Sequence, residues 1–228
     1  MIPECIISSS YLLFMSGFSI YSLQKYTYKK YTKFVPHLVI GSIGLVLVGV
    51  RSCVTIIYKV FINKYTINPL LIEEEEEKNG LRVNLIDEIL RITCTTSIAC
   101  SLFYHNGFYI TGSFITLGIC FFDVYQVMQR IVEQEENHNW MAECYCLLND
   151  YISFEISEDI IKVLWFFALE FVAWWKNDNY CLLAGFPYIL VNFVLPSEGF
   201  YQGWTLQRTI NDYLMIIYVI LVTESLCS

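Results

Sequence analysis

Long apolar stretches alternate with short polar joints along most of the chain, from Cys5 to Cys227. A hydrocarbon core of roughly 30 Å is crossed by about 20 apolar residues in a helix, and several of these stretches approach or exceed that length. Transmembrane β-strands would instead show a period-two alternation of apolar and polar residues. The pattern therefore predicts an all-α, polytopic transmembrane helix bundle, with residues 1–228 forming a single integral membrane domain.

We expect about six spans, within a range of roughly five to seven, on the length needed per crossing. The expected spans cover residues 5–23, 34–60, 92–122, 160–175, 180–195 and 210–227. The third span would extend about 46 Å as a helix, and its centre, residues 104–107, is polar and holds a glycine. Two half-helices could meet there, but we favour one long third helix that protrudes into solvent, because helical apolar spacing continues on both sides.

Small residues mark one side of the second expected span. Gly41, Gly44 and Ser52 fall on one side at 3.6 residues per turn. Small side chains let helix backbones approach closely in lipid. We therefore predict that this side of the span faces protein.

Two polar segments interrupt the spans. The segment 133–159 mixes apolar and polar residues in the manner of an amphipathic helix at a membrane interface. The linker 63–80 contains an acidic run, which we interpret as a solvated loop rather than as a contact for a basic partner, because blocks of like charge repel each other. The acidic run consists of Glu73, Glu74, Glu75, Glu76 and Glu77.

The distribution of lysine predicts an orientation. The joint between the first two spans, residues 25–33, holds the densest basic cluster together with several tyrosines. Basic residues concentrate on the cytoplasmic side of membrane proteins, and tyrosine is enriched at the interface. We therefore place this joint on the cytoplasmic or matrix side, and six crossings would put both termini on the opposite side.

Composition narrows the range of partners. Charged residues make up 16% of the chain, against about 25% in soluble domains. The formal net charge of −8 disfavours nucleic acid, whose binding proteins present a basic surface. Aromatic residues reach 17% and suit contacts with other membrane subunits and with lipids.

Four polar residues inside the expected spans are candidates for function: Arg51, His105, Asn106 and Glu170. An acid within a span can relay protons or pair with a cation; we favour pairing of Glu170 with a neighbouring helix or subunit, with Arg51 as the intramolecular partner if their depths match. His105 and Asn106 could bind a ligand at a helix break. A kinked structural helix bonded to its neighbour is the favoured alternative.

No complete metal or catalytic motif accompanies these residues. Glu135 and His138 have the spacing of half a di-iron site, but a second Glu-x-x-His is missing. Cys144 and Cys146 lack the paired Cys-x-x-Cys spacing of structural zinc. We therefore expect no metal ion, no cofactor and no enzymatic activity.

The function expected from these features is that of a non-catalytic accessory subunit of a large membrane complex, of the respiratory-chain or ATP-synthase type. The mitochondrial inner membrane is the favoured location, with the endoplasmic reticulum or another membrane as the alternative. A small transporter or channel is the rival function, because Glu170, Arg51 and His105 could surround a polar cavity. A membrane enzyme or assembly factor is the third class, and the missing motifs count against it.

Overall fold

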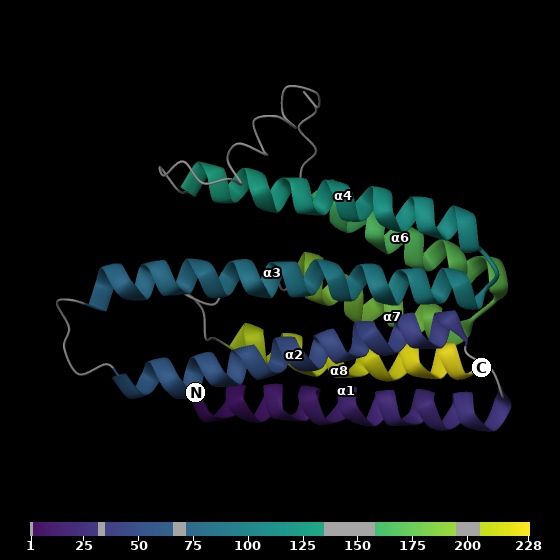
Figure 1. The fold of residues 1–228 in the computed structure, drawn as a ribbon, viewed down its shortest axis with the longest axis horizontal. Coiled ribbons are helices and arrows are strands. Elements are labelled where there is room, and N and C mark those ends of the chain that lie inside the picture. The colour runs from purple at the N-terminus through teal and green to yellow at the C-terminus, as the bar shows by residue number, and fades with distance from the viewer. Residues whose placement is uncertain (1, 32–34, 66–71, 135–157, 195–205) are drawn as a thin grey trace.

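The computed structural model describes residues 2–31, 35–65, 72–134, 158–194 and 206–228, and every regular element in these ranges is a helix. The chain reverses direction between successive α-helices, which lie side by side in a bundle (Figure 1). The helices are α1 (Ile2–Lys30), α2 (Pro36–Tyr65), α3 (Ile72–His105), α4 (Tyr109–Gln134), α6 (Glu158–Lys176), α7 (Asn179–Ile189), the π-helix η1 (Leu190–Val194) and α8 (Leu206–Cys227).

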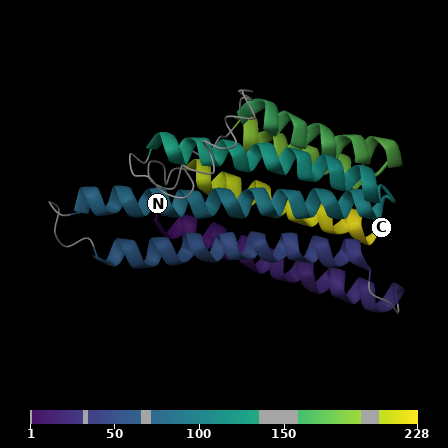
Figure 2. The ribbon, with the colours of Figure 1, turned by 45° about the horizontal axis from the view of Figure 1, so that its top comes forward.

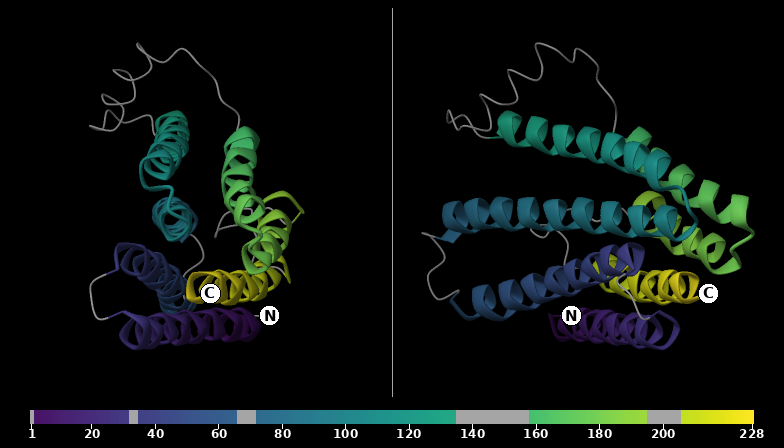
Figure 3. Two further views of the ribbon diagram at one scale, coloured as in Figure 1. Left: turned by 90° about the vertical axis from the view of Figure 1, so that its right-hand side faces the viewer. Right: turned by 45° about the vertical axis from the view of Figure 1, so that its right-hand side comes forward.

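Neighbouring helices follow a ring when the bundle is viewed from one end (Figure 3), and its first and last members, α4 and α6, are also in contact. From α4 the ring passes through α3, α2, α1, α8 and α7 to α6, and each of these successive pairs is in contact. The intermediate view in Figure 2 shows the same side-by-side arrangement. Side chains that point into this ring can therefore contact several helices at one level.

Four of the described helices contain segments long and apolar enough to cross a membrane. The helices confirm the expected all-α class and are consistent with a helical membrane protein, while the expected number of six spans stays a prediction. Helices α6 and α3 are not among these four. In α6 the apolar sequence is interrupted by Lys162 and Glu170, and in α3 it begins only after Arg91. The four segments are Ile6–Lys30, Pro36–Tyr58, Tyr109–Gln129 and Thr209–Cys227.

The predicted long third helix over residues 92–122 is wrong. The chain turns back at Gly107, whose φ is +83°, and the N–H groups of Gly107 and Phe108 donate to the carbonyl oxygens of Tyr104 and Phe103. This pair of bonds is the Schellman motif that ends helices, and the contact between the Phe103 and Phe108 rings, 6.4 Å apart, is the apolar contact that accompanies it. As a result α3 and α4 form an antiparallel hairpin.

The turn between α6 and α7 uses the same motif at the same end of the bundle. Asn177 has a φ of +53°, and the N–H groups of Asn177 and Asp178 donate to the carbonyl oxygens of Trp174 and Ala173. The Asp178 side chain then accepts hydrogen bonds from the second and third N–H groups of α7, as an N-cap residue does. Ser225 of α8 also donates to Asp178, so this turn is fixed to the C-terminal helix.

The hairpin separates the two chain termini. The N-terminus and the C-terminus lie at opposite ends of the bundle (Figure 1). The expectation that both termini share one side is therefore wrong, because the stretch counted as one span makes two antiparallel passes.

The acidic run does not lie in a loop. Helix α3 begins at Ile72, so the backbone of Glu73–Glu77 is helical. Glutamate is a good helix former, and negative charge is favourable in the first turns of a helix. The predicted linker 63–80 is therefore shorter than expected, because α2 extends to Tyr65 and α3 begins at Ile72. Most of the predicted amphipathic segment 133–159 lies outside the described residues.

The predicted small-residue side of α2 is confirmed. A Cβ atom at Gly41 would lie 2.7 Å from Oγ of Ser101 and 2.9 Å from Leu226, and one at Gly44 would lie 2.9 Å from Ile98. Cβ atoms rarely approach other atoms so closely, so α2 could not pack this tightly against α3 and α8 with larger residues. Ser52 on the same side is also buried.

Gly112 provides a test of the α3–α4 hairpin. A Cβ atom there would lie 2.7 Å from Cγ of Phe103 and would overlap its Cβ, and these atoms move only if the helix moves. We expect Gly112→Ala to destabilise the protein by about 1–3 kcal/mol through overpacking. A Cβ atom at Gly118 on the same helix would have no neighbour within 4 Å, so Gly118→Ala should be neutral or stabilising. Unfolding of both variants in mixed detergent micelles checks the difference, and equal effects would contradict the packing.

Candidate functional site

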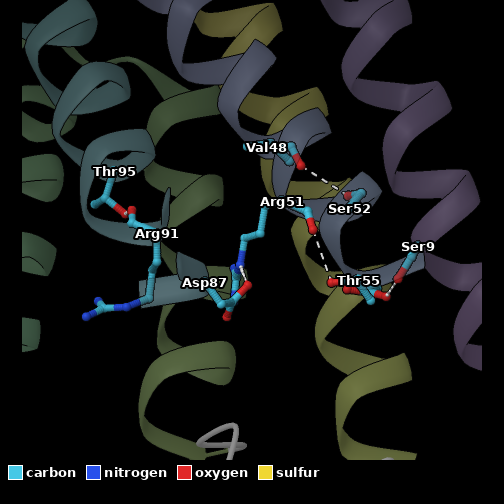
Figure 4. Close-up of polar contacts among 9 residues, drawn as sticks. Ser9, Val48, Arg51, Ser52, Thr55, Asp87, Arg91 and Thr95 are labelled. Carbon is cyan, nitrogen blue, oxygen red and sulfur yellow. Dashed lines mark hydrogen bonds and ion pairs between the residues drawn. The ribbon is translucent and has the colours of Figure 1, made fainter. Parts of the chain in front are cut away.

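The shortest ion pair among the described residues joins α2 to α3. Nε and Nη2 of Arg51 donate to the two carboxylate oxygens of Asp87 over 2.6 and 2.7 Å (Figure 4). The side chains are only 14% and 11% exposed. Two parallel hydrogen bonds of this kind combine charge attraction with a fixed geometry.

A second pair joins α3 to α4, one turn along α3 from Asp87. Nη2 of Arg91 donates to Oδ1 of Asp123 on α4 over 3.1 Å, and Nε1 of Trp165 on α6 donates to Oδ2 of the same carboxylate over 3.1 Å. The Asp123 side chain is 2% exposed. Both carboxylate oxygens therefore have donors, and Asp123 connects three helices.

A third carboxylate connects the first and last helices. The hydroxyl groups of Ser8 and Ser9 on α1 both donate to Oδ2 of Asp212 on α8 over 2.8 Å. Asp212 is 4% exposed and is close enough to Arg51 to attract it electrostatically. In the close-up Ser9 lies beside Thr55 of α2 (Figure 4).

These contacts form one ionic layer, by which we mean Arg51, Asp87, Arg91, Asp123 and Asp212. Asp87 and Arg91 are four residues apart on α3 and so are neighbours on that helix. The layer holds two cations and three carboxylates, and its hydrogen bonds reach α1, α2, α3, α4, α6 and α8. Such an arrangement fixes the axial position of six helices relative to one another.

Sequence reasoning identified Arg51 but not its partner. Arg51 pairs with Asp87, so the expected pairing with Glu170 is wrong. The reason is depth: Glu170 precedes the end of α6 by six residues and Arg51 follows the start of α2 by fifteen, which places them about 9 and 22 Å from the same end of the bundle. The burial of Asp123 is indicated by its spacing in the sequence. It lies four residues from both Ile119 and Val127, and so on the same side of α4 as these apolar residues, which are buried.

Two of the three histidines meet at the end of the bundle that holds the two Schellman turns. The rings of His37 at the start of α2 and His105 at the end of α3 are 5.0 Å apart and inclined by 72°. Nε2 of His37 and Nδ1 of His105 are buried without a hydrogen-bond partner among the described residues. The Ser101 hydroxyl donates to the carbonyl oxygen of His37 over 2.6 Å and holds the two helix ends together.

The side chain of Asn106 bonds back to the last turn of α3. Its Nδ2 donates to the carbonyl oxygen of Leu102 over 2.9 Å. Beside it lies a shallow depression between the two turns and the C-terminus. The depression is lined by His105, Asn106, Lys176, Asn177, Asp178, Asn179, Tyr180 and Ser228.

Glu170 occupies a third environment, at the seam between α6 and α7. Its Oε1 is buried against Gly185 and has no hydrogen-bond partner among the described residues. Arg51, His105 and Glu170 therefore have separate sets of neighbours, and the structure does not bring them together around one cavity. In the described ranges no three His, Cys, Asp or Glu side chains gather as metal ligands would; Glu135, His138, Cys144 and Cys146 lie outside those ranges.

Three comparisons with known proteins give no match. No protein-family model, no curated protein and no solved structure matches the chain. The arguments about function therefore depend on the residues and on the geometry of the bundle.

Proposed function

We propose that the chain is a non-catalytic subunit of a larger membrane complex. The observation that carries this proposal is the use of the buried charges: Arg51 and Arg91 each bind a carboxylate of a neighbouring helix, as expected of charges that hold a bundle together. Charges that line a transport pathway would be expected to face a water-filled cavity.

The outer surface supports the same role. Large apolar side chains are exposed on every long helix, including Phe14 on α1, Phe114 on α4 and Trp174 on α6, at 67%, 76% and 69%. Lipid covers such residues in a membrane, and aromatic side chains also bury large areas against protein partners. The surface thus offers extensive contact area for lipids and for protein partners.

The proposed setting is the mitochondrial inner membrane, in a complex of the respiratory-chain or ATP-synthase type. This part of the proposal rests on the composition of the sequence alone. Fractionation of cells that express the tagged protein tests it, and recovery with endoplasmic reticulum membranes would contradict the mitochondrial assignment.

Native mass measurement tests the proposed role. After extraction in a mild detergent, we expect the 26.7 kDa chain to migrate with companion proteins in constant proportion, well above the mass of a monomer or dimer. Migration as a solitary monomer or dimer, with only bound detergent added, would contradict the proposal.

A small transporter or channel is the alternative, and one observation favours it. Oε1 of Glu170 has no hydrogen-bond partner among the described residues, and an unpaired acid within a span is a common feature of ion and proton pathways. If the purified protein carries a flux in lipid vesicles that Glu170→Gln abolishes, the alternative is correct. The subunit proposal predicts no such flux.

A further inference from the structure

Glu170 lies within the apolar part of α6, near the end marked by two tryptophans and a lysine. Six residues separate it from Lys176, which corresponds to about 9 Å along the helix. Trp174 and Trp175 are 69% and 57% exposed, as expected for residues that anchor a helix at the membrane interface. Glu170 is therefore placed below the interface, where an unpaired carboxylate is costly.

The Glu170 carboxylate lies against a glycine of α7. A Cβ atom at Gly185 of α7 would overlap Oε1 of Glu170 and would lie 3.3 Å from the ring of Phe166. Because Gly185 has no side chain, the carboxylate packs directly against the α7 backbone. One oxygen is thereby buried, while the side chain as a whole remains only half-buried.

Exposed apolar side chains surround this carboxylate. Phe167 and Trp174 lie three and four residues from Glu170 on α6, and Leu182 and Phe186 flank Gly185 on α7. Their exposed fractions are 62%, 69%, 37% and 65%, respectively. We call these four residues and Glu170 the α6–α7 face. It is an apolar surface with one acid at its centre.

Four cations of the described helices have partners other than Glu170. Arg51 and Arg91 bind Asp87 and Asp123. Nζ of Lys176 lies 5.8 Å from the centre of the Phe108 ring, and Lys162 pairs with Asp159 at 3.9 Å. None of the ion pairs among the described residues includes Glu170.

A second copy of the chain would not supply the missing charge. Two copies in one bilayer share the same orientation, and a symmetric dimer places identical residues opposite each other. Contact through the α6–α7 face would therefore bring Glu170 against Glu170 at equal depth, and like charges at short distance disfavour each other. Charge complementarity instead requires a different chain with a cation at this level.

We propose that the α6–α7 face binds a transmembrane helix of another subunit, and that this helix carries a lysine or arginine opposite Glu170, about 9 Å below the interface at the Lys176 end of α6. This inference rests on the proposed subunit role and specifies the partner. Such a cation would satisfy the carboxylate, as charged residues in membranes commonly do in pairs. Phe167, Trp174, Leu182 and Phe186 would pack against the rest of the partner helix.

Site-directed photo-crosslinking in the intact complex tests this inference. A photoreactive phenylalanine analogue replaces Phe167 on the α6–α7 face or, as a control, Phe114 on α4, which is 76% exposed. We expect an adduct from position 167 to an apolar peptide that contains lysine or arginine. Glu170→Gln should lower its yield about tenfold, which corresponds to about 1.4 kcal/mol, and Glu224→Gln, at an exposed acid on α8, should leave it unchanged.

Charge reversal completes the test. Glu170→Lys should abolish the adduct, and replacement of the partner's identified base by glutamate should restore it. The inference is overturned if the adduct maps to a second copy of the chain, if the captured peptide carries no base, or if Glu170→Gln leaves the yield unchanged while the complex keeps its native mass. Migration as a solitary monomer overturns the subunit role together with this inference, whereas an unchanged complex with an unchanged yield overturns only the inference.

Discussion

Replacement of Arg51 by leucine should destabilise the protein by about 3–5 kcal/mol, because it leaves a buried carboxylate without its cation. Asp87 is 11% exposed and accepts two hydrogen bonds from Arg51. Nearby, Asp212 would lose the attraction of the same guanidinium. The fraction of folded protein measured against increasing SDS in mixed micelles gives this free energy.

The double variant Arg51→Leu/Asp87→Leu separates charge imbalance from loss of packing. Buried pairs can often be replaced by apolar residues at little cost, so we expect the double variant to regain roughly half or more of the lost stability. The recovery should be incomplete because Asp212 remains near position 51. A cost below about 1 kcal/mol for Arg51→Leu, or a double variant as unstable as the sum of both single variants, would contradict a buried pair.

The second large effect is expected at Asp123. Asp123→Leu removes the partner of Arg91 and leaves Nε1 of the fully buried Trp165 without its acceptor. We expect a loss of about 3 kcal/mol, less than the largest cost of a broken buried pair because Arg91 is 22% exposed and can partly be solvated. The same unfolding measurement in mixed micelles checks this value.

Trp165→Phe is the matched control for Asp123. It keeps an aromatic ring at position 165 but removes the N–H donor to Asp123, and we expect a smaller loss of about 1 kcal/mol for the hydrogen bond. In the Trp165→Phe background, Asp123→Leu should cost less than in the wild type, because no indole N–H is left without an acceptor. Independent, additive effects would show that the contact between Asp123 and Trp165 is not formed.

The helical class of the protein could be predicted from its apolar runs, because burial in lipid requires each span to satisfy its own backbone. The sequence marks a possible break at Gly107 by a polar, glycine-containing centre, yet helical spacing continues on both sides and favours a single helix. What decides the outcome is a local motif: the Asn106–Gly107 pair and the apolar residues Phe103 and Phe108, five positions apart. These are C-terminal helix signals, and they outweigh the continuity of the apolar pattern.

The ionic layer was only partly predictable. A lone arginine within a span requires a partner, and this reasoning identified Arg51. Which acid pairs with Arg51 depends on the relative depths of the helices, and these depths depend on where the hairpins turn. Asp87 and Asp212 each stand at the margin of an apolar run, a position typical of a polar flank, although both are buried in the folded bundle.

Residue-by-residue photolabelling from the lipid phase tests the central claim most directly, namely that this bundle is embedded in a bilayer with its ionic layer inside. A phospholipid with a diazirine in its acyl chain should label Phe14 and Phe114, which are 67% and 76% exposed. It should spare Phe103 and Trp165, which are 1% and 0% exposed. Absence of label from Phe14 and Phe114, or equal labelling of all four residues, would contradict the account.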